Sequence, residues 1–117
     1  RAQILGLEGE LGAGKTVFVK GFAKAFKIKE TVNSPTFTIF KRYRIPDKDK
    51  YLVHIDAYRL KNEKDLLKIG IKEVFESSNN IVLIEWSDRV KKILPKDCIK
   101  IHIDHIGENK RRIKILF

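Results

Sequence analysis

Cysteine is almost absent from this 117-residue sequence, and no long apolar run occurs in it. The single cysteine, Cys98, excludes an intrachain disulfide and fits a reducing compartment, and its position ahead of an alternating strand pattern favours a buried thiol over a nucleophile. No stretch is apolar enough to cross a bilayer, and the first residues lack the charged and then apolar pattern of a secretory signal. The sequence therefore predicts a cytoplasmic protein with no membrane contact and no disulfide-linked partner.

The sequence has fewer acidic than basic residues. The chain has 15 Asp and Glu against 25 Lys and Arg, a formal net charge of +10. This excess favours polyanions such as RNA, yet most lysines are scattered as on any solvated surface. The dense basic cluster consists of Lys110, Arg111, Arg112 and Lys114. Charge alone leaves direct RNA contact open, because an RNA-binding patch and an ordinary surface both fit it.

The pattern of apolar residues predicts one α/β domain over residues 1–117. A chain of 117 residues with 43% hydrophobic content can bury one core. Strands are expected over 4–7, 37–45, 51–56, 81–84, 99–103 and 113–117, and helices over 17–25, 63–69, 71–75 and 87–93. We expect Asn62 and Ser87 to cap the helices that follow them. One helical crossover beside two hairpins predicts a mixed central sheet flanked by helices.

Residues 9–16, GELGAGKT, match the phosphate-binding P-loop pattern GxxxxGK[ST] and lie between a strand-like and a helix-like run. In such a loop the backbone N–H groups curl around the phosphates, the lysine adds a positive charge, and the hydroxyl of the last residue ligates magnesium. The pattern therefore predicts a P-loop NTPase fold that binds a nucleoside triphosphate with Mg²⁺. The expected nucleotide contacts are Glu10, Leu11, Gly12, Ala13, Gly14, Lys15, Thr16 and Val17.

Two carboxylates each end a predicted strand. Asp56 closes the apolar run 52–55, and Glu85 closes the run 81–84. Ligands of open α/β folds collect at the carboxyl ends of the strands, and a magnesium triphosphate needs at least one carboxylate there. We expect one of the two to hold the metal, directly or through water, and the other to orient or deprotonate the attacking water. Their division of roles stays open, and the alternative for either is an ordinary surface carboxylate.

Several other positions have two interpretations each. Residues 34–36, Ser-Pro-Thr, form either a loop that senses the terminal phosphate or an ordinary turn. Arg59 either stabilises charge in the transition state or pairs with an acidic neighbour. Trp86 is either a core aromatic or a wall of the nucleotide site. The histidines lack the spacing of a metal cluster and are interpreted as structural: His54, His102 and His105.

Four short segments follow one another in a specific order: LGAGKT at 11–16, SPTF at 34–37, HIDAYRL at 54–60 and IEW at 84–86. Their order and spacing resemble the bacterial TsaE (YjeE) family, and the resemblance covers most of the chain. It implies an ATPase required for making threonylcarbamoyladenosine, the modified base beside the anticodon of certain tRNAs. It also implies the TsaD and TsaB proteins as partners, whose complex is reset or driven by ATP hydrolysis between catalytic rounds.

The resemblance further implies ATP and Mg²⁺ as ligands. The implied site residues are Lys15 and Thr16 (phosphate and magnesium contacts), Thr36 (switch loop), Asp56 and Glu85 (metal handling and catalysis) and Trp86 (a functional aromatic). Two features depart from the family pattern. Ser87 stands where members often have proline, and the usual segment before the first strand is absent. The second departure predicts a shortened domain and bears on adenine recognition, because residues ahead of that strand help to form the pocket.

The residues alone leave two other functions open. A small kinase would pass the phosphoryl group to a metabolite, but it needs a lid, and the chain has no long Arg-rich insertion to supply one. A nucleotide-gated RNA-binding module would use the basic cluster at 110–114 without a partner protein. No base-reading motif distinguishes ATP from GTP.

Overall fold

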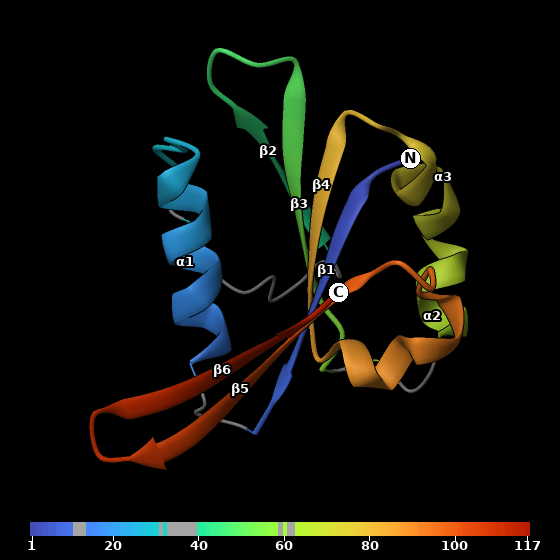
Figure 1. Ribbon diagram of the computed structural model, residues 1–117. Helices are drawn as coiled ribbons and strands as arrows, with labels where there is room; N and C mark the ends of the chain where they lie inside the picture. The colour runs from blue at the N-terminus through green and yellow to red at the C-terminus, as the bar shows by residue number, and fades with distance from the viewer. Residues whose placement is uncertain (11–13, 31, 33–39, 59, 61–62) are drawn as a thin grey trace.

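Figure 1 shows the computed structural model, in which a central sheet carries helices on both faces. The structure describes residues 1–10, 14–30, 32, 40–58, 60 and 63–117. In chain order the elements are β1 (Gln3–Gly9), α1 (Lys15–Ala25), β2 (Phe40–Ile45), β3 (Lys50–Asp56), α2 (Lys64–Lys68), α3 (Ile71–Glu76), β4 (Asn80–Glu85), the 3₁₀ helix η1 (Ser87–Ile93), β5 (Ile99–Gly107) and β6 (Lys110–Leu116). None of the described helices is both long and apolar enough to cross a membrane.

The strands form one six-stranded sheet in the order β2-β3-β4-β1-β5-β6. β1 runs parallel to β4 and β5, and β3 runs parallel to β4. The edge strands β2 and β6 run antiparallel to β3 and β5. The predicted mixed sheet is therefore confirmed. Its parallel centre places the carboxyl ends of β1, β3 and β4 at one edge of the sheet, which is the edge that carries the predicted site residues.

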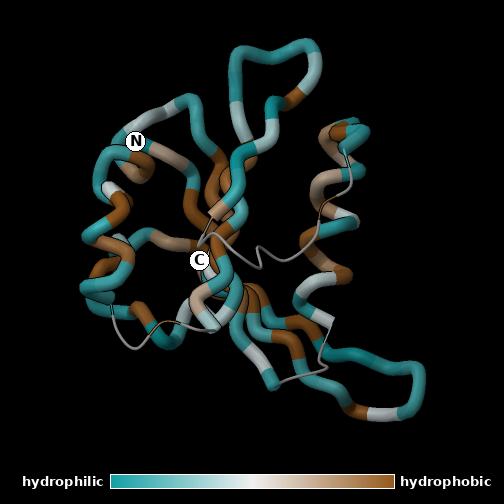
Figure 2. The backbone as a smooth tube through the Cα atoms, turned by 180° about the vertical axis from the view of Figure 1, so that it is seen from behind, coloured by the Kyte–Doolittle hydropathy of each residue, from teal (hydrophilic) through white to brown (hydrophobic). Residues whose placement is uncertain are grey.

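The sheet separates two apolar layers. Leu5 and Leu7 of β1 pack with Val19 and Ala23 of α1 on one face. Ile4 points to the opposite face and belongs to the layer beneath α2, α3 and η1. The apolar run 81–84 lies in β4, which is covered on both faces as its uninterrupted pattern predicts. In Figure 2 the strands at the centre of the sheet are largely brown, and teal predominates towards the ends of the two hairpins.

The start of η1 differs from the sequence prediction. Ser87 is the first residue of η1 and does not cap it; Trp86 is the N-cap residue and makes no side-chain cap bond. Ser87 Oγ instead donates to the carbonyl oxygen of Leu7, at 3.3 Å. The approach is close because Gly6 faces Ser87: a Cβ on Gly6 would lie 2.8 Å from the Ser87 Cβ. Asn62, the other predicted cap, lies outside the described residues.

Replacing Gly6 with alanine tests this close packing. The added methyl group would meet Ser87 Cβ, which cannot move without the backbone, so Gly6→Ala should lower the free energy of unfolding by about 1–3 kcal/mol. Gly21→Ala is the matched control, because a Cβ there meets nothing within 4 Å in an exposed part of α1. It should raise the free energy of unfolding by about 0.5–1 kcal/mol. Denaturant unfolding of both variants checks the opposite signs; equal effects would contradict the packing argument.

Candidate nucleotide-binding site

The described ends of the P-loop have the backbone geometry that the motif predicts. β1 ends at Gly9, and α1 begins at Lys15. Gly14 caps α1 with a φ of 103°, a left-handed conformation that glycine adopts without steric cost. The first N–H groups of α1 therefore point into the loop that precedes them, where they favour an anion. Leu11, Gly12 and Ala13 lie outside the described residues, so their predicted phosphate contacts stay predictions.

Lys15 is buried at the base of this loop, with 5% of its surface exposed. Its Nζ donates to the carbonyl oxygens of Gly9, at 2.6 Å, and Glu10, at 2.9 Å. Burial lowers the pKa of Lys15 below its usual value, and the carboxylates of Glu85, Asp88 and Asp56 oppose that shift. The ammonium group is thus held by groups that belong to the loop itself.

Thr16 and Glu85 meet across the site. Thr16 lies in the first turn of α1, and its Oγ1 donates to Glu85 Oε1 at 3.2 Å. Glu85 is the last residue of β4 and is 2% exposed. Its other oxygen, Oε2, lies 2.5 Å from Nε2 of His54, which is fully buried in β3. Both carboxylate oxygens of Glu85 are therefore fixed by hydrogen bonds.

Asp56 stands directly opposite Glu85 in the parallel register of β3 and β4. Burial raises the pKa of Asp56 above its usual value. The Tyr58 N–H, which donates to Asp56 Oδ1 at 3.0 Å, opposes the shift, and the charge of Glu85 adds to it. The structure thus brings the two predicted carboxylates together on neighbouring strands.

Trp86 turns the chain out of β4 in a left-handed conformation, with a φ of 60°. The Lys15 Nζ lies 3.9 Å from the centre of its ring, and the Tyr58 ring lies 5.1 Å away. The Arg89 guanidinium covers the Trp86 ring at 5.7 Å. Trp86 also packs partly against the core layer beneath η1. Trp86 therefore borders the core and also contacts the P-loop lysine, and its role as a wall of the nucleotide site stays a prediction.

Other predicted site residues cannot be placed. Thr36, with the rest of the 34–37 segment, and Arg59 lie outside the described residues. Their predicted roles at the terminal phosphate stay predictions. Among the described residues, no group of three or more His, Cys, Asp or Glu could hold a metal ion. A magnesium ion that takes most of its ligands from phosphates and water does not need such a group.

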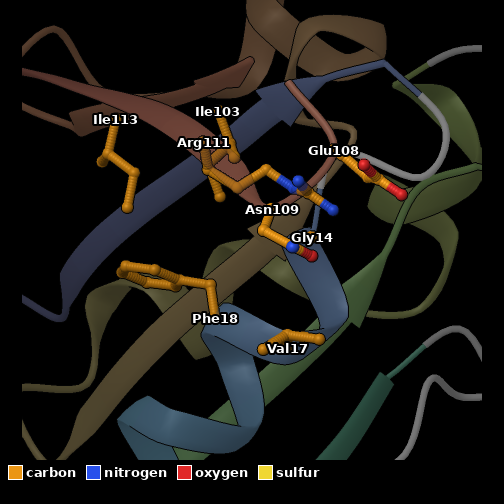
Figure 3. Close-up of a pocket in the computed structure, with 8 residues that line it drawn as sticks. All are labelled: Gly14, Val17, Phe18, Ile103, Glu108, Asn109, Arg111 and Ile113. Atoms are coloured by element: carbon orange, nitrogen blue, oxygen red, sulfur yellow. The ribbon is translucent and has the colours of Figure 1, made fainter. Parts of the chain in front are cut away.

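A cavity of about 390 Å³ opens beside the P-loop, between α1 and the β5–β6 hairpin (Figure 3). Its lining residues are Gly14, Val17 and Phe18 from the α1 side and Ile103, Glu108, Asn109, Arg111 and Ile113 from the hairpin. Arg111 reaches towards the N-terminus of α1, because its Nε lies 3.7 Å from where a Cβ on Gly14 would stand. Arg111 and Ile113 both line this cavity, and successive residues of a strand point to opposite faces. Arg111 therefore lies on the other face of β6 from Lys110, Arg112 and Lys114.

A second hollow of about 440 Å³ is lined by Gly9 together with Glu8, Trp86, His102 and Asp104, among others. His102 bridges two carboxylates: its Nδ1 lies 3.0 Å from Glu8 Oε1, and its Nε2 lies 2.8 Å from Asp104 Oδ1. The hydrogen bond with Glu8, and then that with Asp104, raises the pKa of His102. His102 of β5 is thereby linked to Glu8 of β1, and its structural role stays a prediction.

Two features of the site were missed from the sequence. His54, for which the sequence predicts only a structural role, contacts Glu85. His54 stands two residues before Asp56 in the same predicted strand, and residues with this spacing point to the same face. This spacing is the sequence signal that places His54 near the predicted carboxylates. The hairpin residues of the 390 Å³ cavity gave no local signal, because they join the site only through the fold.

The loop between β1 and α1, with carboxylates at the ends of β3 and β4, defines a P-loop NTPase fold. The family model for the threonylcarbamoyl adenosine biosynthesis protein TsaE matches residues 1–113. The chain belongs to this TsaE family, whose members take part in tRNA threonylcarbamoyladenosine biosynthesis.

Individual relatives agree with the family match. The TsaE protein of Bacillus subtilis is 42% identical over 110 residues, covering 94% of this chain and 66% of its own length. The TsaE protein of Aquifex aeolicus is 41% identical, covering 97% of this chain and 77% of its own length. The crystal structure of Bacillus subtilis YdiB superimposes with a TM-score of 0.76 at 37% identity, covering 96% of this chain and 66% of that one. The chain thus spans about two thirds of the two Bacillus proteins.

Proposed function

We propose that residues 1–117 form a P-loop domain that binds Mg-ATP and hydrolyses it during threonylcarbamoyladenosine synthesis on tRNA. The observation that carries the proposal is the contact of Thr16 with Glu85 beside the buried Lys15. Three groups that a magnesium triphosphate requires, a cation, a hydroxyl and a carboxylate, are thereby gathered at the N-terminus of one helix. Membership of the TsaE family supports a role in threonylcarbamoyladenosine biosynthesis, and we propose that the protein acts in this tRNA modification in the cytoplasm.

The phosphates would lie over the N-terminus of α1, with Lys15 as the positive charge. Lys15 Nζ now bonds two loop carbonyls, and these are weaker partners for an ammonium group than phosphate oxygens. Thr16 and the two carboxylates supply hard oxygen ligands of the kind that Mg²⁺ prefers, so the residues present fit this metal. Bound Mg²⁺ would neutralise charge that develops on the phosphates.

The two carboxylates would have different roles, one at the metal ion and the other at the attacking water. Glu85 is fixed at both oxygens and touches the Thr16 hydroxyl, which suits it to orient groups at the metal. Asp56 has a raised pKa, and a base works better as its pKa approaches the working pH, which suits it to accept the proton from water. Thr36 and Trp86 would complete the site at the terminal phosphate and beside Lys15.

The nucleoside would lie in the 390 Å³ cavity beside Gly14. Its volume falls in the range of small-molecule sites. The apolar side chains of Phe18, Ile103 and Ile113 suit a base, and Asn109 and Arg111 offer hydrogen-bonding groups at its rim. Gly14 lines this cavity and also caps α1, so this placement puts the base next to the proposed phosphate site.

TsaD and TsaB are the proposed partners, and ATP hydrolysis would reset or drive their complex between catalytic rounds. A partner is expected because P-loop hydrolysis is slow until the water and the transition-state charge are fully positioned. Phosphate release from Mg-ATP should therefore be slow for the chain alone and faster with purified TsaD and TsaB.

Two outcomes of that assay would contradict the proposal. Equal rates with and without the partners would remove the partner role. Transfer of the phosphoryl group to a small acceptor, in place of free phosphate, would indicate a kinase. Nucleotide-dependent tRNA binding by the chain alone would instead favour an RNA-binding module.

A further inference from the structure

We infer that His54 is a positioning residue for Glu85, and this inference rests on the proposed hydrolysis at the P-loop. His54 Nε2 lies 2.5 Å from Glu85 Oε2, and His54 has no exposed surface. Glu85 is 2% exposed. Two buried groups at this distance hold each other in one orientation, because neither finds water as an alternative partner.

The register of β3 and β4 shows that His54 and Glu85 are diagonal neighbours and do not stand directly opposite each other. In the parallel pairing of β3 and β4, His54 stands opposite Leu83, and Asp56 stands opposite Glu85. Successive residues of a strand point to opposite faces, so these four side chains share the face covered by α1. Glu85 is long enough to reach back along the sheet to His54, and this turns its other oxygen towards Thr16.

The hydrogen bonds of His54 indicate which of its ring nitrogens carries a hydrogen towards Glu85. His54 Nδ1 is buried and has no hydrogen-bond partner among the described residues. A buried N–H without an acceptor costs more than a buried nitrogen lone pair without a donor. A carboxylate only accepts hydrogen bonds, so a hydrogen on Nε2 fits the site and His54 donates to Glu85 Oε2.

His54 reaches the proposed site through Glu85, the residue that its Nε2 contacts. Removing the donor should leave nucleotide affinity unchanged and let Glu85 rotate away from its working position. Loss of such an outer partner should lower the hydrolysis rate on the order of 10- to 100-fold.

Two polar substitutions of similar folding cost separate positioning from a packing role. In His54→Gln the amide nitrogen reaches about as far as Nε2, whereas in His54→Asn it reaches only as far as Nδ1. The rate of hydrolysis at saturating Mg-ATP, with TsaD and TsaB present, should stay close to wild type for His54→Gln. For His54→Asn it should fall about 10- to 100-fold, with the Kd for ATP unchanged. Tyr43→Phe is the control for this face, because the buried Tyr43 hydroxyl has no hydrogen-bond partner among the described residues.

A double-mutant cycle shows whether His54 acts through Glu85. In a Glu85→Ala background, His54→Asn should cause no further loss of rate. Equal rates for His54→Gln and His54→Asn, or a further loss in the Glu85→Ala background, would overturn the inference even if Glu85 matters. A normal rate for Glu85→Ala would instead contradict the proposed role of Glu85 and, with it, that of His54. Thermal unfolding of each variant shows whether it is folded at the assay temperature, so that the rates of folded proteins are compared.

Discussion

Lys15→Ala should strongly weaken the binding of Mg-ATP. The Lys15 ammonium is the buried cation of the proposed phosphate site. Without this ammonium group, the negative charges of the nearby Glu85 and Asp56 carboxylates would repel a bound triphosphate. Truncating one side of a buried charged contact costs about 2–5 kcal/mol, which is roughly 30- to 5,000-fold in Kd. Isothermal titration calorimetry of the variant with Mg-ATP measures the loss.

Lys20→Ala is the matched control for this substitution. Lys20 lies one turn further along α1 and is exposed, so the variant loses the same charge without losing a buried contact. Its Kd for Mg-ATP should stay close to that of wild type. If both variants bound ATP equally well, the P-loop lysine would have no special role.

Glu85→Ala should separate binding from hydrolysis. The substitution removes the carboxylate that contacts Thr16 and His54 but leaves the Lys15 contacts with the loop intact. Much of the affinity for ATP should therefore remain, whereas hydrolysis should fall about 100- to 10,000-fold, as for loss of a positioned catalytic group. The measurement is phosphate release at saturating Mg-ATP in the presence of TsaD and TsaB.

Two companion variants support the interpretation of Glu85→Ala. Glu85→Gln keeps the size of the side chain and removes only its charge, so it should also lose hydrolysis. Glu76→Ala removes an exposed carboxylate at the end of α3 and should hydrolyse ATP at the wild-type rate. A normal rate for Glu85→Ala in the assembled complex would show that this carboxylate has no catalytic role.

The parts of the fold that local physics determines were predicted from the sequence. The apolar run 81–84 and the alternation over 99–103 and 113–117 indicate strands, because side chains must match the faces they cover. The P-loop was predicted for the same reason: its glycines, lysine and threonine act within one short segment.

The contacts that depend on register and close packing were not predicted. His54 meets Glu85 only because β3 pairs with β4 in one specific alignment, and no single segment reveals that alignment. The cap prediction for Ser87 was wrong because Gly6 leaves room for the Ser87 hydroxyl to reach a carbonyl of β1. Arg111 looked like part of a basic surface cluster, but the β5–β6 hairpin carries it to the N-terminus of α1.

Calorimetric titration of the chain with Mg-ATP tests the central claim most directly. The account predicts heat of association for one nucleotide per chain, and loss of that heat in the variant that lacks the Lys15 ammonium. No heat with Mg-ATP or Mg-GTP from folded protein would contradict the proposed nucleotide site and every role assigned around it.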